Sequence, residues 1–380
     1  MPMFEFLYWL LSYVVPFLAV LTVIVFVHEM GHYLVARWNG VAIDAFSIGF
    51  GRELIGWNDR HGTRWKISAV PLGGYVRFTG DMNAASVPDP DTLANVDPEL
   101  APRLFANKNV WQRIAVVAAG PLANVILTFL ILYALLLGYG RYTIPPVVGD
   151  VIAGSVAEAA GIEPGDIITA VDGYAVRGFE DFQRMVATSP ERPVTVELDR
   201  GSVSKTLVLV PEAVDVEDRF GNSQRIGRIG VSRDVAETDV TLYRPGPVEA
   251  VGMTVEEIRF IIQRTAAFLG DFFVGRGDVE QLGGPVKVAK VSGEVATLGI
   301  VALINLTALL SLNIGIFNLL PVPMLDGGHL LYYLVEAVRG RPLSMRVQEM
   351  GFRFGFALVL ALMVFTLFND TLFAYFGILR

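Results

Sequence analysis

His28, Glu29 and His32 stand close together in the segment FVHEMGHYLVARW, at the end of a long apolar stretch. Residues four apart on a helix share one face, so the imidazoles of His28 and His32 can reach one metal ion. Glu29 projects about 100° away around the helix axis. It would therefore lie beside the metal, suited to take a proton from a bound water. Zn²⁺ lowers the pKa of such a water to about 7, so the spacing predicts hydroxide chemistry near neutral pH.

The position of these side chains in an apolar stretch supports the metal interpretation. The chain has only four histidines. Ionisable groups at membrane depth cost at least about 2.5 kcal/mol each, so they usually mark function. The alternative is a pair of interfacial histidines, with Glu29 in an ion pair with Arg37. Because the chain has no cysteine, any metal must be held by His, Asp or Glu.

Asp326, in the segment NLLPVPMLDGGHLL, is the candidate for a third metal ligand. A catalytic zinc ion usually takes three protein ligands and leaves one position open. Two prolines before Asp326 break the helix, and two glycines after it let the backbone approach closely. Two alternatives remain. Asp326 could cap a helix that starts near Gly327, or His329 could compete as third ligand, although a supporting or structural role is expected for it.

Helices at membrane depth must position these residues. The 380-residue chain is 53% hydrophobic and 18% charged, with a mean hydropathy of +0.50, whereas soluble domains have about 25% charged residues. The net charge of −8, without a basic tract, gives no indication of nucleic-acid binding. A span needs about 20 apolar residues. Four segments predict a multi-span α-helical membrane protein with four transmembrane helices, at residues 7–36, 111–137, 298–320 and 354–376.

Lysine and arginine near the span ends predict the orientation in the membrane. They are concentrated in the loops at 39–110 and 331–353, which are therefore expected on the cytoplasmic side. Lys287 and Lys290 weaken this bias without reversing it. Both chain termini should then lie on the outer side, and the histidine pair should face the cytoplasmic half of the membrane.

The first cytoplasmic loop contains two β-rich segments, VAIDAFSIGFGRELIGW and RWKISAVPLGGYVRF. The turn-like sequence NDRHG separates them. Together they predict a β-hairpin or small sheet on the cytoplasmic side, with an apolar edge toward the membrane.

Residues 146–212 predict a separate soluble module on the outer side, because strand-like runs enclose a helical segment. Its segment GSVAEAAGIEPGDIITAVDGYAV resembles the core of a bacterial PDZ domain, an α+β fold, in a single copy. The matching residues are Ala160, Gly161, Ile162, Pro164, Gly165, Asp166, Ile168, Val171 and Gly173. The segment at 248–274 predicts an amphipathic helix. It could lie on the membrane or against the spans, or it could pack on the soluble module.

The expected organisation alternates membrane spans with loops and one inserted module. Its parts are a first transmembrane segment with HExxH (1–38), a cytoplasmic loop with a membrane-associated β-hairpin (39–110), a second transmembrane segment (111–138), the PDZ-like module (146–212), a connector with the amphipathic helix (213–297), a third transmembrane segment with the Leu-Asp-Gly motif (298–330), a cytoplasmic loop (331–353) and a fourth transmembrane segment (354–377).

The sequence resembles the site-2 protease family of intramembrane zinc metalloproteases over nearly its whole length. The HEMGH segment is similar to that family's metal motif, and NLLPVPMLDG (318–327) is similar to its second motif. AGPLAN (119–124) and PLGGYVRF (71–78) also resemble family segments. The chain looks most like the bacterial regulator-of-sigma-E protease (RseP) type. It departs from the best-known member of that group in having one PDZ copy rather than two.

The resemblance implies roles for seven residues. They are the zinc ligands His28, His32 and Asp326, the general base and acid Glu29, and the substrate-binding residues Asn318, Gly73 and Gly74. The hairpin around Gly73 and Gly74 is implied to lie beside the substrate as an extended edge. A substrate helix must unwind to expose a carbonyl, and a β-edge replaces the hydrogen bonds that it loses. The alternative for these two glycines is an ordinary turn.

The resemblance further implies hydrolysis of peptide bonds inside the transmembrane segments of single-span proteins, in a bacterial inner membrane. Expected substrates are anti-sigma factors already cut on the outer side, or signal-peptide remnants. The module could bind a new C-terminus or exclude bulky substrates. Two other classes remain open. One is an ion carrier, although inverted repeats are not evident; the other is a non-enzymatic PDZ scaffold, whose structural metal site would usually have four ligands.

Overall fold

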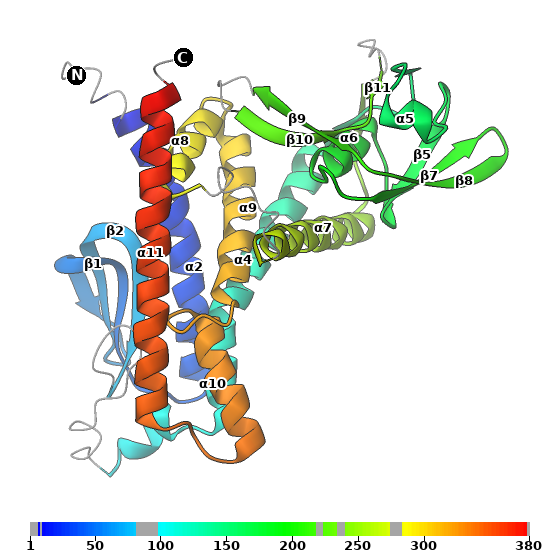
Figure 1. Cartoon of the computed structure of the whole chain (residues 1–380). Helices are drawn as coiled ribbons and strands as arrows, with labels where there is room; N and C mark the ends of the chain where they lie inside the picture. The colour runs from blue at the N-terminus through cyan, green and yellow to red at the C-terminus, as the bar shows by residue number, and fades with distance from the viewer. Residues whose placement is uncertain are drawn as a thin grey trace. The chain divides into compact units, whose positions relative to one another are not determined.

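The structure is a computed structural model (Figure 1). It describes Leu7 and residues 10–80, 98–217, 223–233, 240–273 and 283–377. The chain divides into two compact units. The first consists of Met1–Leu132 and Asp278–Arg380, and the second of Tyr133–Gly277.

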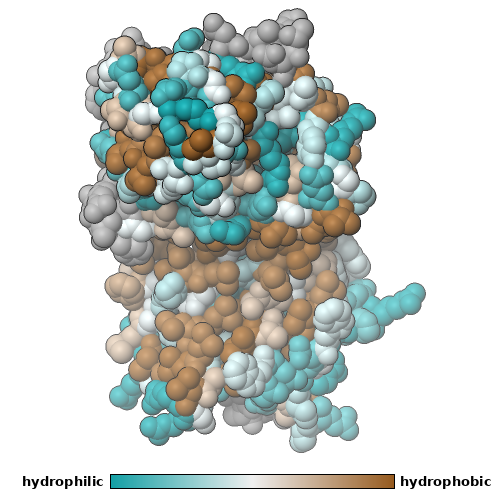
Figure 2. Space-filling model, turned by 90° about the vertical axis from the view of Figure 1, so that its right-hand side faces the viewer, coloured by the Kyte–Doolittle hydropathy of each residue, from teal (hydrophilic) through white to brown (hydrophobic). Residues whose placement is uncertain are grey.

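Four helices in the described part of the chain are long and apolar enough to cross a membrane. They are Leu10–Trp38, formed by a π-helical turn (η1, Leu10–Val14) and α2 (Val15–Trp38), then α4 (Val110–Tyr139), α9 (Ile300–Asn318) and α11 (Met345–Gly377). They expose many large apolar side chains, and Figure 2 shows brown apolar atoms gathered over the lower half of its view. So large an apolar surface is typical of contact with lipid. The prediction of four apolar helices of span length is confirmed, although the last helix begins at Met345 rather than at residue 354.

A sheet formed by β1 (Ile43–Asn58) and β2 (Arg64–Phe78) lies beside α2 (Figure 1). The predicted β-hairpin is therefore present. The buried Phe46 ring stacks on Trp65 with 4.4 Å between centroids, and it meets Tyr33 of α2 edge-on at 5.7 Å. Aromatic pairs of this kind add about 0.5–1.5 kcal/mol each beyond the area that they bury. The cluster therefore holds the sheet against the first span.

The two strands are bent rather than straight. Residues 45–48 pair with 74–77 on one side and with 64–67 on the other. The bend in β1 falls at Gly49 (φ +87°) and Gly51 (φ +86°), a conformation that side chains disfavour. Residues 74–77 pair with 45–48 along one edge only. Their other edge has no paired strand among the described residues.

Asp59, in the turn between β1 and β2, ties the sheet to α2 by hydrogen bonds. Its carboxylate accepts from the Tyr33 hydroxyl (2.7 Å), the Trp65 indole (3.2 Å), and the backbone amides of His61 (2.8 Å) and Thr63 (2.9 Å). Partial burial raises the pKa of Asp59, but the hydrogen bonds outweigh it and lower that pKa from 3.8 to about 2. The carboxylate is therefore charged throughout the physiological pH range.

We expect Asp59→Asn to lower the melting temperature by about 2–4 °C near neutral pH, the shift that roughly 1 kcal/mol produces in a chain of this size. Because folding lowers the pKa of Asp59, its stabilisation is complete above about pH 4 and is lost as the pH falls toward about 2. Thermal unfolding of both proteins in detergent at about pH 6 and about pH 3 measures this. The difference between them should narrow at the lower pH. A difference that is the same at both pH values would contradict the prediction.

The first unit also contains four short elements. They are η2 (Ala101–Arg103), η3 (Phe105–Asn107), α8 (Pro285–Ala296) and α10 (Asp326–Arg339). The segment between α9 and α10 contains Met324, whose φ of +106° is rare for a residue with a side chain. α11 packs directly on this segment and on α10: a Cβ at Gly355 would overlap the Pro323 carbonyl, and one at Gly351 would overlap the Tyr332 hydroxyl of α10. Glycine at these positions therefore permits the close approach of α11.

The second unit is a small α+β module followed by a long helix. Its described strands form one four-stranded sheet, in the order β6-β5-β7-β8, and three two-stranded sheets, β3 with β12, β4 with β11, and β9 with β10. The elements are β3 (Arg141–Thr143), β4 (Asp150–Val151), α5 (Val156–Ala159), β5 (Ile167–Val171), β6 (Tyr174–Ala175), α6 (Phe179–Ala187), β7 (Val194–Arg200), β8 (Val203–Leu209), β9 (Glu212–Glu217), β10 (Ser223–Arg228), β11 (Val231–Ser232), β12 (Thr241–Tyr243) and α7 (Pro247–Phe273). Alternation along β7 places Val194, Val196 and Leu198 in the core.

α7 packs on this module through one of its faces. Phe260 is buried in the module's core, and its ring meets Tyr174 edge-on with 5.5 Å between centroids. Arg184 of α6 holds both carboxylate oxygens of Glu257, with one N–O distance of 2.8 Å. The sequence left open whether this helix lies on the membrane, against the spans or on the soluble module. Its buried face packs on the module.

Candidate metal centre

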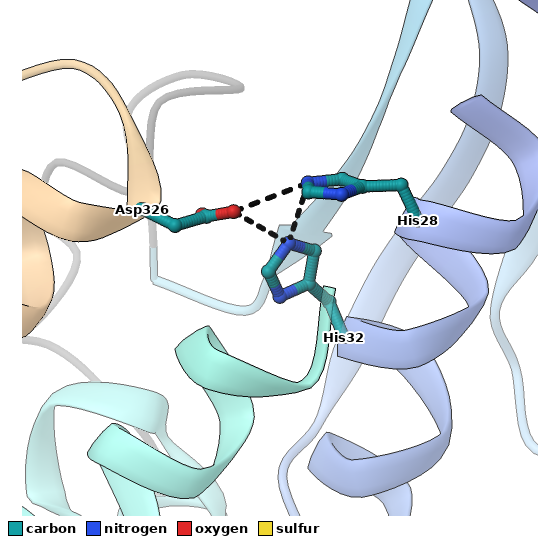
Figure 3. Close-up of side chains that lie close together, drawn as sticks. All are labelled: His28, His32 and Asp326. Atoms are coloured by element: carbon teal, nitrogen blue, oxygen red, sulfur yellow. Dashed lines mark hydrogen bonds and ion pairs between the residues drawn. The ribbon is translucent and has the colours of Figure 1, made fainter. Parts of the chain in front are cut away.

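Asp326 and two histidines converge from separate helices (Figure 3). His28 and His32 lie one turn apart on α2, and Asp326 begins α10. The Oδ2 atom of Asp326 lies 3.1 Å from His28 Nε2 and 3.5 Å from His32 Nε2, and the two Nε2 atoms are 3.2 Å apart. Three atoms of ligand type therefore form a compact triangle.

This triangle fits a zinc ion. Ligand atoms about 2.0–2.1 Å from a tetrahedral zinc are roughly 3.3 Å from one another, close to the separations found here. Oδ2 of Asp326 is buried and has no hydrogen-bond partner among the described residues, which a metal bond would remedy. His32 Nδ1 donates to the Val116 carbonyl oxygen at 2.9 Å, which leaves its Nε2 lone pair facing the triangle. The donor set is therefore suited to zinc.

The structure bears on both alternatives for Asp326. Asp326 is the first residue of α10, the cap position is Leu325, and no side-chain hydrogen bond caps the helix. The capping alternative is therefore wrong. His329 lies one turn further along α10 and lines the same cavity, but it is outside the group of three side chains that could hold an ion among the described residues. Its ring is tilted toward Tyr333, with 6.5 Å between centroids.

Glu29 lies beside the triangle, against β2. Its carboxylate lies near the backbone amide of Val76. A Cβ at Gly74 would be 3.1 Å from Glu29 Cγ and 2.8 Å from Val25 Cγ1, so glycine there lets the strand approach α2 closely. In the described residues Glu29 forms no ion pair with Arg37; its side chain lines the metal-site cavity instead.

A cavity of about 220 Å³ contains this arrangement. It is lined by His28, Glu29, His32, Gly74, Tyr75, Val76, Phe78, Phe105, Val116, Val117, Asn318, Met324, Asp326, His329 and Tyr333. Asn318, the last residue of α9, therefore shares a cavity with the triangle, as does one edge of β2. The room and the mixture of polar and apolar walls suit an extended peptide segment.

Gly73 and Gly74 have different surroundings. Gly74 lines the cavity, whereas Gly73 is not among the lining residues. Gly73 has a φ of +142°, and a Cβ there would overlap the ring of Phe50. The structure therefore brings six of the seven implied site residues to one cavity, whereas Gly73 lies in β2 outside the lining.

The sequence reasoning missed one face of α4. Val116, Gly120 and Asn124 are four residues apart, so they share a helix face. Val116 accepts from His32, Asn124 contacts His28 Nδ1 at 3.2 Å, and a Cβ at Gly120 would lie 2.9 Å from His28 Cε1 and overlap His32 Nε2. The AGPLAN segment is the available signal, because small residues and a buried amide within a span indicate close contact with another helix.

A histidine pair, a converging aspartate and an adjacent glutamate among membrane-length helices are the groups that a zinc-dependent metalloprotease needs. The chain belongs to peptidase family M50, whose family model matches residues 16–362. A Mesorhizobium japonicum protein is 50% identical over 361 residues, 95% of this chain and 98% of the relative. A Rhizobium meliloti protein is 48% identical over 361 residues, 95% and 96% of the two chains. Both are named as predicted zinc metalloproteases.

A third relative, the metalloprotease MmpA of Caulobacter vibrioides, is 38% identical over 379 residues, covering 94% of each chain. These relatives match almost the entire chain, both spans and loops. The predicted family, the enzyme class and the zinc cofactor are therefore confirmed. The family match therefore favours a metalloprotease over the two other classes that the sequence left open, the ion carrier and the non-enzymatic scaffold.

Proposed function

We propose that this metalloprotease hydrolyses peptide bonds within the transmembrane segments of single-span membrane proteins. The observation that carries the proposal is the position of the cavity. It is built from α2, α4, α9 and the start of α10, and the first three are helices long and apolar enough to span a bilayer. A protease with its donor set among such helices is suited to a substrate that is itself in the membrane.

The placement of the residues supports the roles that we propose for them. His28, His32 and Asp326 hold the zinc ion, which when bound polarises a carbonyl and makes water more acidic. Glu29 takes a proton from the attacking water and passes it to the leaving nitrogen. Glu29 and Val76 line the same cavity, so the carboxylate can act there. Asn318, which lines the same cavity, binds the substrate.

The edge of β2 is the proposed docking strand for the substrate. Residues 74–77 pair with 45–48 on one side, and their other side borders the cavity. A transmembrane helix has its peptide bonds hydrogen-bonded internally, so it must unwind before hydrolysis. Strand addition would supply new partners to the unwound segment. Gly73 and Gly74 serve this edge, Gly74 by letting it lie against α2 and Gly73 by permitting the bend.

The second unit is the proposed site of substrate selection. Its sheet and two short helices are compatible with the PDZ resemblance of the segment around Ala160–Gly173. On the orientation predicted by the basic loops, this unit and both termini lie on the outer side of a bacterial inner membrane. It either binds a C-terminus released by a first cleavage or excludes substrates with bulky outer domains. Anti-sigma factors shortened on that side, and signal-peptide remnants, are the proposed substrates.

Purified protein in detergent, incubated with a single-span test substrate, tests the proposed function. We expect cleavage inside the hydrophobic segment, located by mass spectrometry. A zinc chelator should abolish the cleavage, and added Zn²⁺ should restore it, because the metal supplies the activated water. Substrates with and without a folded outer domain provide the comparison, and the shorter one should be cut faster. Cleavage confined to a soluble flanking region would refute the intramembrane assignment.

A further inference from the structure

The ring of His28 makes polar contacts at both nitrogens. Nε2 faces Asp326 Oδ2 at 3.1 Å, and Nδ1 lies 3.2 Å from Nδ2, the nitrogen of the Asn124 side-chain amide. A neutral imidazole that ligates a metal through Nε2 must carry its proton on Nδ1. The group that faces Nδ1 must then accept a hydrogen bond, and Asn124 is the group in that position.

Asn124 is fully buried in α4, and its Oδ1 atom has no hydrogen-bond partner among the described residues. An unpaired buried acceptor destabilises the fold, because it loses the hydrogen bonds that water would give it. The two ends of an asparagine amide have nearly the same shape, so a half-turn exchanges oxygen and nitrogen, and the hydrogen-bond network decides between them. The orientation that brings Oδ1 to Nδ1 gives this oxygen a donor and leaves the Nε2 lone pair for the metal.

We propose that Asn124 is a positioning residue that accepts a hydrogen bond from His28 Nδ1–H and so holds this imidazole in the zinc-binding tautomer. The inference rests on the proposed role of His28 as a metal ligand. His32 shows the same arrangement, because its Nδ1 donates to the Val116 carbonyl at 2.9 Å. Both acceptors lie on one face of α4, two turns apart, with Gly120 between them.

The surroundings of Asn124 fix its position. Its backbone carbonyl accepts from the Thr128 hydroxyl at 2.9 Å and from the Ser311 hydroxyl of α9 at 3.1 Å. A Cβ at Gly315 would lie only 3.3 Å from Asn124 Cβ, so α9 passes close to it. Because the side chain is enclosed, solvent cannot readily replace its oxygen as the partner of His28. Removal of the amide therefore has a defined consequence for the histidine.

The test compares zinc affinity, measured by chelator competition on the full-length protein in detergent. Asn124→Leu keeps the approximate volume but removes the acceptor, and we expect it to weaken zinc binding by about 10- to 100-fold, the usual effect of losing such a partner. Asn124→Asp keeps an acceptor and should retain the affinity. Ser311→Ala is the matched control, since it removes a hydrogen bond to the backbone of Asn124 but leaves the amide in place. It should bind zinc like the unchanged protein.

Zinc affinity separates this inference from the assignments on which it rests. His28→Ala should bind zinc more weakly than Asn124→Leu. If loss of His28 had no effect on zinc binding, its role as a ligand would fail, whatever the result at position 124. If His28→Ala weakens binding but Asn124→Leu does not, the positioning role is overturned. Equal weakening in Asn124→Leu and Asn124→Asp, with the melting temperatures of both unchanged, would overturn it as well.

Discussion

Glu29→Gln should leave the zinc content of the purified protein unchanged and reduce cleavage of a single-span substrate by at least about 100-fold, the lower range for loss of a general base. Glutamine has nearly the same shape as glutamate, so the contact with β2 at Gly74 is preserved. An amide is too weak a base to accept the proton of the attacking water, and its N–H groups are too weakly acidic to protonate the leaving nitrogen. The measurement is kcat/KM in detergent together with zinc analysis of the same sample.

Glu349→Gln is the control for this substitution. Glu349 is exposed on α11 and pairs with Arg353 at 2.6 Å, a type of surface contact that contributes little to stability. This variant should cut the substrate at the unchanged rate. Full cleavage by Glu29→Gln would remove Glu29 from the mechanism. Loss of zinc from Glu29→Gln would instead give the side chain a part in binding the metal.

Gly120→Ala should abolish both zinc binding and cleavage while the helix remains intact. The added methyl group would overlap His32 Nε2 and lie 2.9 Å from His28 Cε1, so both rings would have to move from the triangle. The ring of His32 has little freedom, because the same helix holds it at the Val116 carbonyl. Alanine favours a helix over glycine by about 1 kcal/mol. A loss of zinc therefore could not be attributed to a weaker α4.

Gly138→Ala, near the end of the same helix, is the matched substitution. A Cβ at Gly138 would meet no atom within 4 Å among the described residues. Zinc affinity and cleavage should be unchanged in this variant, and circular dichroism should show equal helix content in both. Normal zinc binding by Gly120→Ala would mean that α4 can move away from α2, and that its close approach is not needed for the site.

The spans and the metal triangle could be predicted because their signals are local or chemically rare. Apolar length identifies a span without knowledge of its neighbours, and His28 and His32 share a face on any helix. Asp326 lies almost three hundred residues further along, and it was found through zinc's need for a third ligand. The contribution of α4 could not be found in this way. Gly120 matters because it has no side chain and so leaves room for the two histidine rings. Asn124 matters through a contact between two helices.

The sheet and the amphipathic helix illustrate a similar limit. Composition predicted two β-rich segments, but not that residues 45–48 would have partners on both sides, because that depends on bends at Gly49 and Gly51. The helix α7 has an apolar face that could have met lipid or protein equally well. Burial of Phe260 in the module decides where that face packs, and periodicity contains no information about the partner.

The packing of α11 on Pro323 has a consequence for the order in which the enzyme becomes competent. During synthesis, both histidines and Asp326 leave the ribosome before Gly351 and Gly355 do. Until those glycines arrive, nothing from the last span supports the segment that aims the carboxylate. A nascent chain therefore contains His28, His32 and Asp326 before α11 can support the segment that precedes Asp326. We expect these three side chains to reach their final arrangement only after α11 has been inserted.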